Sequence, residues 1–526
     1  MSDKLIHLWP EITLFITTCV VMVLGLSPQA EVRRLCSWVA GVGLIVAAGL
    51  AANAQPDPNA LLPYLMPFAK VVIAAVGVLM LMLLAGTVDR DYEASIQAGK
   101  AKFDALKSNR AEFYSFFLFS LTGLMLCTSA ESLIWLFLAL ELTSLPTYIM
   151  VVISTRGKKS QEAGVKYFFL GALGAAFFLF GFTLIYGGTG ATHFNEISSA
   201  IATNGMNPIL TLGLLITLLG LFFKIAAVPM HFYTPDVYQG AASPVSAMLA
   251  FVPKTAGFIA IIMICASVGW RFGPDGNSLP EAVRLLLWIA AALTMTVGNM
   301  LALRQRSIKR LLAYSSIAHS GYMLVGIIAG PGLVDGAFTS NGLAAVLFYL
   351  LAYGFMNVGT FAVLAALRHA DGTEADDIDD IRGLVWTHPV LGWSMVLCAL
   401  SLLGFPPLLG FLGKLGLFMS AISAGEISIV IILGLNSAIA AVYYLKLVVT
   451  PYLERPAEHD VMRVESVGIL PRPMVAAVSA ASVIGLIFVA GPLIKASARA
   501  GIAVRSVEAA STAIEPAVIA EHDAKD

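Results

Sequence analysis

Long apolar stretches recur along almost the whole 526-residue sequence, separated by short polar segments. About 20 apolar residues are enough to cross a bilayer as a helix, and fourteen stretches approach or exceed that length. They lie near residues 5–26, 35–52, 65–86, 112–128, 131–153, 163–187, 209–239, 244–268, 281–303, 311–330, 341–367, 389–421, 427–450 and 471–494. The sequence therefore predicts an all-α polytopic membrane protein with about fourteen transmembrane helices.

The composition supports this class and excludes others. Hydrophobic residues make up 58% of the chain and charged residues 12%, whereas an average soluble chain carries about 25% charged residues. The formal net charge is -1, so no basic field favours nucleic acid. We therefore exclude nucleic-acid binding and expect the lipid bilayer as the chain's surroundings.

No cofactor, nucleotide or metal ion is predicted in this chain. The cysteines stand singly in apolar stretches, without the CxxC spacing or neighbouring histidine of a zinc, haem or iron–sulfur site. The sequence also lacks a glycine-rich phosphate-binding pattern. The cysteines, which we expect to be small buried apolar residues, are Cys19, Cys36, Cys127, Cys265 and Cys398.

Basic residues are concentrated in one set of connecting segments. The segments after odd-numbered spans hold 18 lysines and arginines, whereas those after even-numbered spans hold only Arg271. Because cytoplasmic loops retain basic residues, both termini are predicted to face away from the cytoplasm. The first span carries Glu11 and lacks a signal-peptide pattern, so we expect it to be retained. The tail after about residue 495 is expected to be surface or partly disordered.

Four charged residues lie near the centres of predicted spans, on four different helices. An ionisable side chain in hydrocarbon costs several kcal/mol and normally faces a polar interior or a pathway. These positions predict that the four side chains face a polar interior or a pathway inside the bundle. The four residues are Glu141, Lys224, Lys254 and Lys414.

Simpler interpretations of buried charges stay open. A central carboxylate such as Glu141 could be only the structural ion-pair partner of a lysine. A lysine near the end of a span can extend its amine to the interface, and we expect this of Lys70, Lys166 and Lys446. That explanation fits the three central lysines poorly, because each lies many residues from a span end.

Prolines interrupt the seventh and twelfth spans. Pro229 and Pro235 lie in the seventh, and Pro406 and Pro407 in the twelfth. A proline inside a helix removes a backbone hydrogen bond and breaks or kinks it, and such breaks persist in membranes only where protein or water meets the freed groups. Broken spans in corresponding positions of two halves indicate inverted repeats around a central site; packing kinks without a repeat are the alternative.

The spacing of the breaks divides the chain into four parts. Residues 1–111 hold three helices and a cytoplasmic loop, and residues 112–268 form the first five-helix repeat. Residues 281–450 form the second, inverted repeat. Residues 451–526 are predicted to hold a cytoplasmic loop, the fourteenth helix and the tail.

Three segments resemble the antiporter-like membrane subunits of proton-pumping NADH:quinone oxidoreductase (respiratory complex I), which are related to Mrp cation/proton antiporters. These segments read FKIAAVPMHFYTPDVYQGAASPVSAMLAFVPKTAGF, RQRSIKRLLAYSSIAHSGYMLVG and IRGLVWTHPVLGWSMVLCALSLLGFPPLLGFLGKLGLF. The strings PDVYQGA and GFLGK make the resemblance specific, and it extends over about residues 110–455.

The resemblance implies a proton path and the type of subunit. The family's path uses a glutamate on the fifth helix, lysines on the broken seventh and on the eighth, and a lysine on the broken twelfth, which match Glu141, Lys224, Lys254 and Lys414. Lys414 separates the chain from subunit M, which has glutamate there. The expected lack of a long lateral helix after residue 495 separates it from subunit L, so subunit N fits best.

Electrostatics then gives a mechanism. Burial disfavours a charged lysine and a nearby carboxylate favours it, so a change in the pairing of Glu141 would switch proton binding at Lys224. Water in the broken helices would connect the lysines. Candidate relays are His231, His319 and Lys166, although a structural role for each histidine stays open.

The resemblance also implies the surroundings of the chain. Partners would be other membrane-arm subunits, especially subunit M and the small subunits J and K, in a bacterial inner membrane with both termini periplasmic. NADH, FMN, iron–sulfur clusters and quinone would belong to partner subunits. The loops at 87–111 and 371–380 are expected to be solvated cytoplasmic loops.

Two other functions stay open. A free-standing Mrp-type cation/proton antiporter subunit would use the same lysines and broken helices without a redox partner. A quinone-binding subunit would need a lipid-facing cavity with polar contacts, for which the sequence offers no residues.

Overall fold

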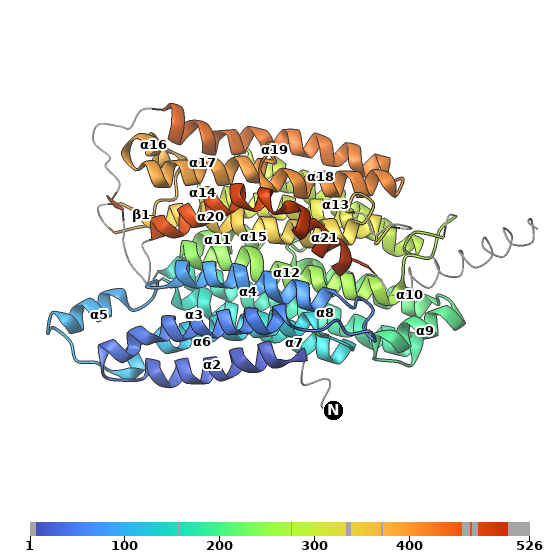
Figure 1. The fold of residues 1–526 in the computed structure, drawn as a ribbon, viewed down its shortest axis with the longest axis horizontal. Coiled ribbons are helices and arrows are strands. Elements are labelled where there is room, and N and C mark those ends of the chain that lie inside the picture. The colour runs from blue at the N-terminus through green and yellow to red at the C-terminus, as the bar shows by residue number, and fades with distance from the viewer. Residues whose placement is uncertain are drawn as a thin grey trace, which may run out of the picture.

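The computed structural model describes residues 7–155, 157–274, 276–332, 338–369, 372–454, 463–464 and 472–502. Long helices run side by side along the longest axis of the molecule (Figure 1). Within these residues the strands are two residues long: β1 (Leu367–Arg368) pairs antiparallel with β2 (Arg463–Val464). The prediction of an all-α bundle is confirmed.

Ten helices in the described part of the chain are long and apolar enough to cross a membrane. Each falls within or around a stretch that the hydrophobic pattern identifies. They are α3 (Ala30–Ala52), α4 (Leu65–Leu84), α6 (Arg110–Thr128), α7 (Leu133–Ile153), α8 (Lys158–Thr189), α12 (Ser243–Val268), α13 (Glu281–Ala302), α14 (Ile308–Ala329), α15 (Gly342–Ala366) and α19 (Ile427–Leu453).

The other predicted spans correspond to shorter or bent helices. Those with 15–17 residues are α2 (Trp9–Gly25), α10 (Pro208–Lys224), α17 (Pro389–Leu403) and α18 (Leu409–Ser423). The last span is split into α20 (Arg472–Phe488) and α21 (Ala490–Ala500), which meet at 83° and would give an eleventh crossing if counted as one. The number fourteen therefore stays a prediction.

Short elements mark the two ends of the bundle. We call one the α5 end, because α5 (Arg90–Gln97), β1 and α16 (Leu384–Thr387) lie there, and the other the α9 end, after α9 (Phe194–Asn204) (Figure 1). The remaining short elements are η1 (Ala105–Lys107), α11 (Thr234–Gly240) and η2 (Ile378–Ile381).

Burial varies with the position of a helix in the bundle. Every residue of α12 and α15 is buried, and so are nearly all of those in α14. In contrast, α8 and α19 expose large apolar side chains such as Phe169 and Leu435. Exposed apolar faces of this kind suit contact with lipid chains, whereas α12, α14 and α15 form the protein-enclosed centre where polar groups can be satisfied.

Both predicted helix breaks are confirmed. The seventh span is interrupted between α10 and α11, and the twelfth between α17 and α18. Backbone groups freed in the first break are bound by side chains: Val228 N donates to Thr294 Oγ1 at 2.9 Å, and Ser320 Oγ donates to the carbonyl of Ile225 at 2.5 Å. Such internal partners are what allow irregular backbone at membrane depth.

Two expectations about charged residues are wrong. Lys70 does not extend to the interface: it is fully buried, its Nζ lies 2.7 Å from Glu11 Oε1 in the first turn of α2, and it donates to the carbonyl of His7 at 2.7 Å. The loop at 87–111 is not simply solvated, because Glu93 on α5 is buried and binds the buried Arg33 through both carboxylate oxygens, each at 2.8 Å.

Candidate functional site

Glu141 and Lys224 form an ion pair between α7 and the end of α10. Lys224 Nζ lies 3.0 Å from Glu141 Oε1 and donates to Ser144 Oγ at 2.6 Å. Lys224 is the last residue of α10, and the dipole at a helix C-terminus favours a positive charge. The Lys224 side chain is 1% exposed and that of Glu141 is 19% exposed. The lysine is therefore enclosed, whereas part of the glutamate side chain remains accessible.

Lys254 lies in the middle of α12, directly after Pro253, where every neighbouring residue is buried. Its Nζ donates to both the hydroxyl and the carbonyl oxygen of Ser316 on α14, and it lies 5.2 Å from the centre of the Tyr353 ring. No carboxylate among the described residues pairs with it, so hydroxyl, carbonyl and ring groups alone replace water around this amine.

α12 approaches α10 closely at the two lysines. Gly257, one turn from Lys254, lies so near α10 that a Cβ placed there would be 2.9 Å from Lys224 Cβ. Ser320 connects the two sites, because its hydroxyl contacts the carbonyl of Ile225, the residue after Lys224, and that of Ser316, at 3.3 Å. Hydroxyl and carbonyl groups therefore link the neighbourhood of Lys224 to that of Lys254.

His319 lies at the centre of a chain of hydroxyl groups on α14, α15 and α19. Its Nδ1 lies 2.6 Å from the Tyr349 hydroxyl and its Nε2 2.7 Å from the Tyr444 hydroxyl. The Tyr444 hydroxyl also contacts Ser315 Oγ, next to the serine that binds Lys254. A buried histidine between two hydroxyls can accept a proton on one nitrogen and release one from the other.

Lys414 lies on α18, just after the second break. Its Nζ donates to the carbonyl of Leu403, the last residue of α17, at 2.7 Å and lies 5.2 Å from the centre of the Tyr322 ring. The amine therefore satisfies a carbonyl that the break frees. Gly404 closes over the side chain, because a Cβ there would be 2.8 Å from Lys414 Cδ.

Comparisons with known proteins identify the family. Residues 130–440, more than half of the chain, match the family described as NADH:quinone oxidoreductase/Mrp antiporter, TM. The chain belongs to this family.

Relatives in the family cover most of the chain. NADH-quinone oxidoreductase subunit N of Trichlorobacter lovleyi is 37% identical over 461 residues, which make up 86% of this chain and 88% of that protein. A chain in the structure of respiratory complex I from Thermus thermophilus with bound aureothin has a TM-score of 0.73 at 29% identity, covering 94% of this chain and all of that one. A chain of the Mrp complex from Dietzia sp. has a TM-score of 0.75 at 18% identity and shows the shared fold.

We call the three buried lysines, Glu141 and the groups that hydrogen-bond to them or to His319 the lysine row. Two of the predicted relays lie outside it. Lys166 is 42% exposed and binds Glu162 and Asp236 on the surface of the bundle, at 2.7 and 2.9 Å. His231 lies in the first break, and its buried Nδ1 has no hydrogen-bond partner among the described residues. Of the three predicted relays, only His319 is placed between groups of the row.

Sequence reasoning missed the hydroxyl groups that complete the row. Serines and tyrosines are common in apolar helices, so nothing in their type marks these positions. The one available signal was the spacing on α14, where Ser315, His319 and Tyr322 recur every three or four residues and so share a helix face. Those missed are Ser144, Ser315, Ser316, Ser320, Tyr349 and Tyr444.

The side chains of the described residues offer no set of ligands for a metal: no group of three or more His, Cys, Asp or Glu lies close enough together. The row is built from amines, hydroxyls, one imidazole and one carboxylate. Such groups exchange protons by rearranging hydrogen bonds.

Proposed function

We propose that this chain translocates protons across the membrane as an antiporter-like subunit, of the subunit N type, in a proton-pumping NADH:quinone oxidoreductase. The observation that carries the proposal is the row of three buried lysines, with one carboxylate at its start and hydroxyl groups between its members. Glu141, Lys224, Lys254 and Lys414 are the proton-carrying residues, and His319 is a relay.

The pair at the start of the row acts as the switch. A charged lysine is costly in an apolar interior unless a partner offsets the lost hydration. When Glu141 moves away from Lys224, the positive charge loses its partner and the proton leaves toward the hydroxyls of Ser144 or Ser320. When the pair reforms, Lys224 takes up another proton.

The later steps use groups on α12, α14 and α18. Protons pass from Lys254 through Ser316, Ser315, Tyr444 and His319 and reach Lys414 across the region of Tyr322. Each transferred charge repels the next lysine, so the titrations of the three amines are coupled. Large helix movements are not required, because a change of pairing at one lysine alters the field at its neighbour.

The redox reaction belongs to partner subunits in this proposal. NADH, FMN, the iron–sulfur clusters and quinone are held there, and this chain is a non-redox subunit of the translocase. Its neighbours are subunit M and the small subunits J and K. The chain crosses a bacterial inner membrane with both termini periplasmic, and residues 112–268 and 281–450 are the two inverted repeats.

The test uses the assembled complex in sealed vesicles. We expect Lys254→Met to reduce NADH-driven proton uptake strongly while subunit composition is kept, because methionine preserves the length of the side chain without a protonatable group. Lys107→Ala, at a 70% exposed side chain in the loop after α5, is the control. Unchanged proton uptake in Lys254→Met would contradict the proposal.

Copurification distinguishes the proposed function from its main alternative. If the chain purifies without NADH:quinone oxidoreductase subunits and exchanges sodium for protons in vesicles, it is a free-standing Mrp-type antiporter subunit.

A further inference from the structure

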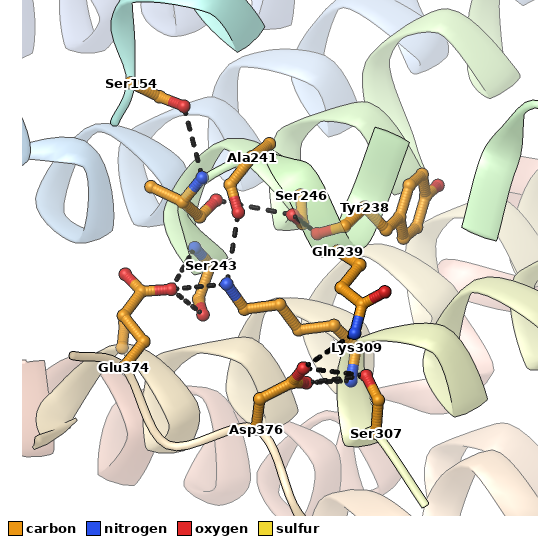
Figure 2. Close-up of polar contacts among 12 residues, drawn as sticks. Ser154, Tyr238, Gln239, Ala241, Ser243, Ser246, Ser307, Lys309, Glu374 and Asp376 are labelled. Carbon is orange, nitrogen blue, oxygen red and sulfur yellow. Dashed lines mark hydrogen bonds and ion pairs between the residues drawn. The ribbon is translucent and has the colours of Figure 1, made fainter. Parts of the chain in front are cut away.

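The acidic segment of residues 372–380, which we call the acidic strap, is not the solvated loop that the sequence predicts. It follows β1 at the α5 end and crosses the junction between α11 and α12. Glu374 from the strap points into this junction (Figure 2). Its Oε2 accepts hydrogen bonds from Ser243 N at 2.9 Å, Ser243 Oγ at 2.7 Å and Lys309 Nζ at 2.6 Å.

Lys309 completes this contact from the first turn of α14. Its side chain is 7% exposed, although the sequence places it among the loop cations. Its amine donates both to Glu374 and, at 3.1 Å, to the carbonyl of Ala241, in the short link between α11 and α12. Ala242 N donates to Ser154 Oγ at 3.1 Å. Lys309 and Ser154 thus hold the backbone of this link, and Glu374 holds the first residue of α12 beside it.

Asp376 makes an equivalent contact at the start of α14. It accepts from the Ser307 hydroxyl at 2.8 Å and from Lys309 N at 3.0 Å, and Gln239 of α11 donates to it at 3.3 Å (Figure 2). The strap therefore places one carboxylate at the N-terminus of α12 and another at that of α14. Negative charge is stabilised at both places by the helix dipoles, and α12 and α14 carry Lys254 and His319.

An open vestibule of about 630 Å³ lies beside the strap at the α5 end. Its wall includes Glu374, Lys309 and residues 239–242 of the α11–α12 junction. The residue before this wall, Tyr238, is buried, and its hydroxyl lies 3.5 Å from Ser316 Oγ, which binds Lys254. The junction thus lies between the vestibule wall and Tyr238, whose hydroxyl contacts the serine that binds Lys254.

We propose that the acidic strap is a latch and that Glu374 is a positioning residue that keeps the α11–α12 junction closed between the vestibule and Lys254. The junction is short and depends on side-chain contacts, so release of Glu374 from Ser243 and Lys309 frees the backbone around Ala241 and Ala242. Water from the vestibule then reaches Tyr238 and Ser316. The consequence for protons rests on the proposed function, whereas the closure itself does not.

The closure is tested by cysteine labelling of the purified complex. Cys19 is the exposed one of the five cysteines, so Cys19→Ser provides the background and Ala242→Cys the reporter. We expect Glu374→Gln to make the reaction of a soluble maleimide with residue 242 about tenfold faster or more, because glutamine removes the negative charge that strengthens the hydrogen bonds from Ser243 and Lys309. Glu374→Asp keeps the charge but shortens the side chain, so it should also speed labelling. It serves as the test if the glutamine variant does not assemble.

Asp379→Asn is the matched control. Asp379 lies in the same strap, but its side chain is 51% exposed and binds Arg306 and Arg382 rather than the ends of α12. Equal labelling rates in Glu374→Gln, Glu374→Asp and the unchanged strap would overturn the latch and leave the proposed function standing. Faster labelling without any change in protons taken up per NADH would overturn the link between the latch and the lysine row.

Discussion

Lys224 Nζ and Glu141 Oε1 lie 3.0 Å apart, although 83 residues separate them in the chain. The lysine ends α10 where the helix breaks, and the glutamate reaches it from the middle of α7, five residues before Pro146. The lysine is almost completely enclosed, whereas part of the glutamate remains accessible. A pair with one enclosed and one accessible member can separate by moving the carboxylate alone.

The first prediction concerns this pair. Glu141→Gln and Lys224→Ala should each slow NADH-driven proton uptake about tenfold or more, since a buried hydrogen bond between charged groups contributes roughly 1.5–3 kcal/mol and 1.4 kcal/mol is a factor of ten. The measurement is fluorescence quenching in vesicles that hold the assembled complex. Lys107→Ala should leave uptake unchanged, and normal uptake in both inner variants would remove the pair from the path.

Hydropathy and charge patterns predicted the positions of the helices and of the buried lysines, but they did not predict which residues form hydrogen bonds with the buried polar groups. A buried charge is rare enough in a span to be noticed at Lys254 or Lys414. The partner of Lys254 is Ser316, 62 residues away, and that of His319 is Tyr444, 125 residues away. These contacts depend on which helices pack together, and no periodicity within one helix carries that information.

The acidic strap shows the opposite error. A run of acidic residues reads as a solvated loop, and Asp377 and Asp379 fit this because they pair with Arg306 at an exposed position. Glu374 is enclosed because Lys309, Arg368 and Ser243 converge on it. Local composition cannot distinguish Glu374 from Asp377 and Asp379, because its burial depends on contacts with the N-terminal ends of α12 and α14.

The second prediction tests the hydroxyl chain around His319. Tyr444→Phe removes the hydroxyl that contacts both His319 Nε2 and Ser315 and leaves the ring in place. A neutral hydrogen bond contributes about 1 kcal/mol, so proton uptake should slow about fivefold. Tyr452→Phe is the matched control, because Tyr452 lies on the same helix, is exposed, and is not part of the hydroxyl chain. Equal effects of the two variants would argue against a proton path through Tyr444.

The third prediction concerns the pH dependence of stability at the strap. Burial alone would raise the pKa of Glu374, but Lys309 and Arg368 beside it lower that pKa to about 2. A carboxyl with a lowered pKa stabilises the folded state fully above its ordinary value of 4.5 and loses this contribution as the pH falls toward 2.

Glu374→Gln should therefore reduce the pH dependence of thermal unfolding between about pH 4.5 and 2, by an amount on the order of 3 kcal/mol across the whole interval. The measurement is the unfolding temperature of the purified complex at several pH values. A variant with the same pH dependence as the unchanged protein would show that Glu374 is not held in its charged form by this cluster.

The fourth prediction concerns the buried pair Glu11–Lys70. Removing one member of a buried ion pair leaves an unpaired charge and typically costs about 3–5 kcal/mol, whereas replacing both by apolar residues is often neutral. Lys70→Met alone should lower the unfolding temperature of the complex, and the double variant Glu11→Leu with Lys70→Met should recover it. Equal stability of the single and double variants would show that the pair is not the source of the effect.

The last prediction asks whether Lys414 must release its proton or only supply a positive charge. Its amine donates a hydrogen bond to the carbonyl of Leu403 at the end of α17, so both roles require a positively charged donor at this position. Arginine keeps the charge and the donor but does not lose its proton in proteins. Lys414→Arg should therefore assemble normally yet take up protons as poorly as Lys414→Ala. Lys446→Arg, at an exposed lysine on α19, is the control for the same substitution. Full proton uptake by Lys414→Arg, with loss of assembly in Lys414→Ala, would make Lys414 a structural partner of the helix break rather than a proton carrier.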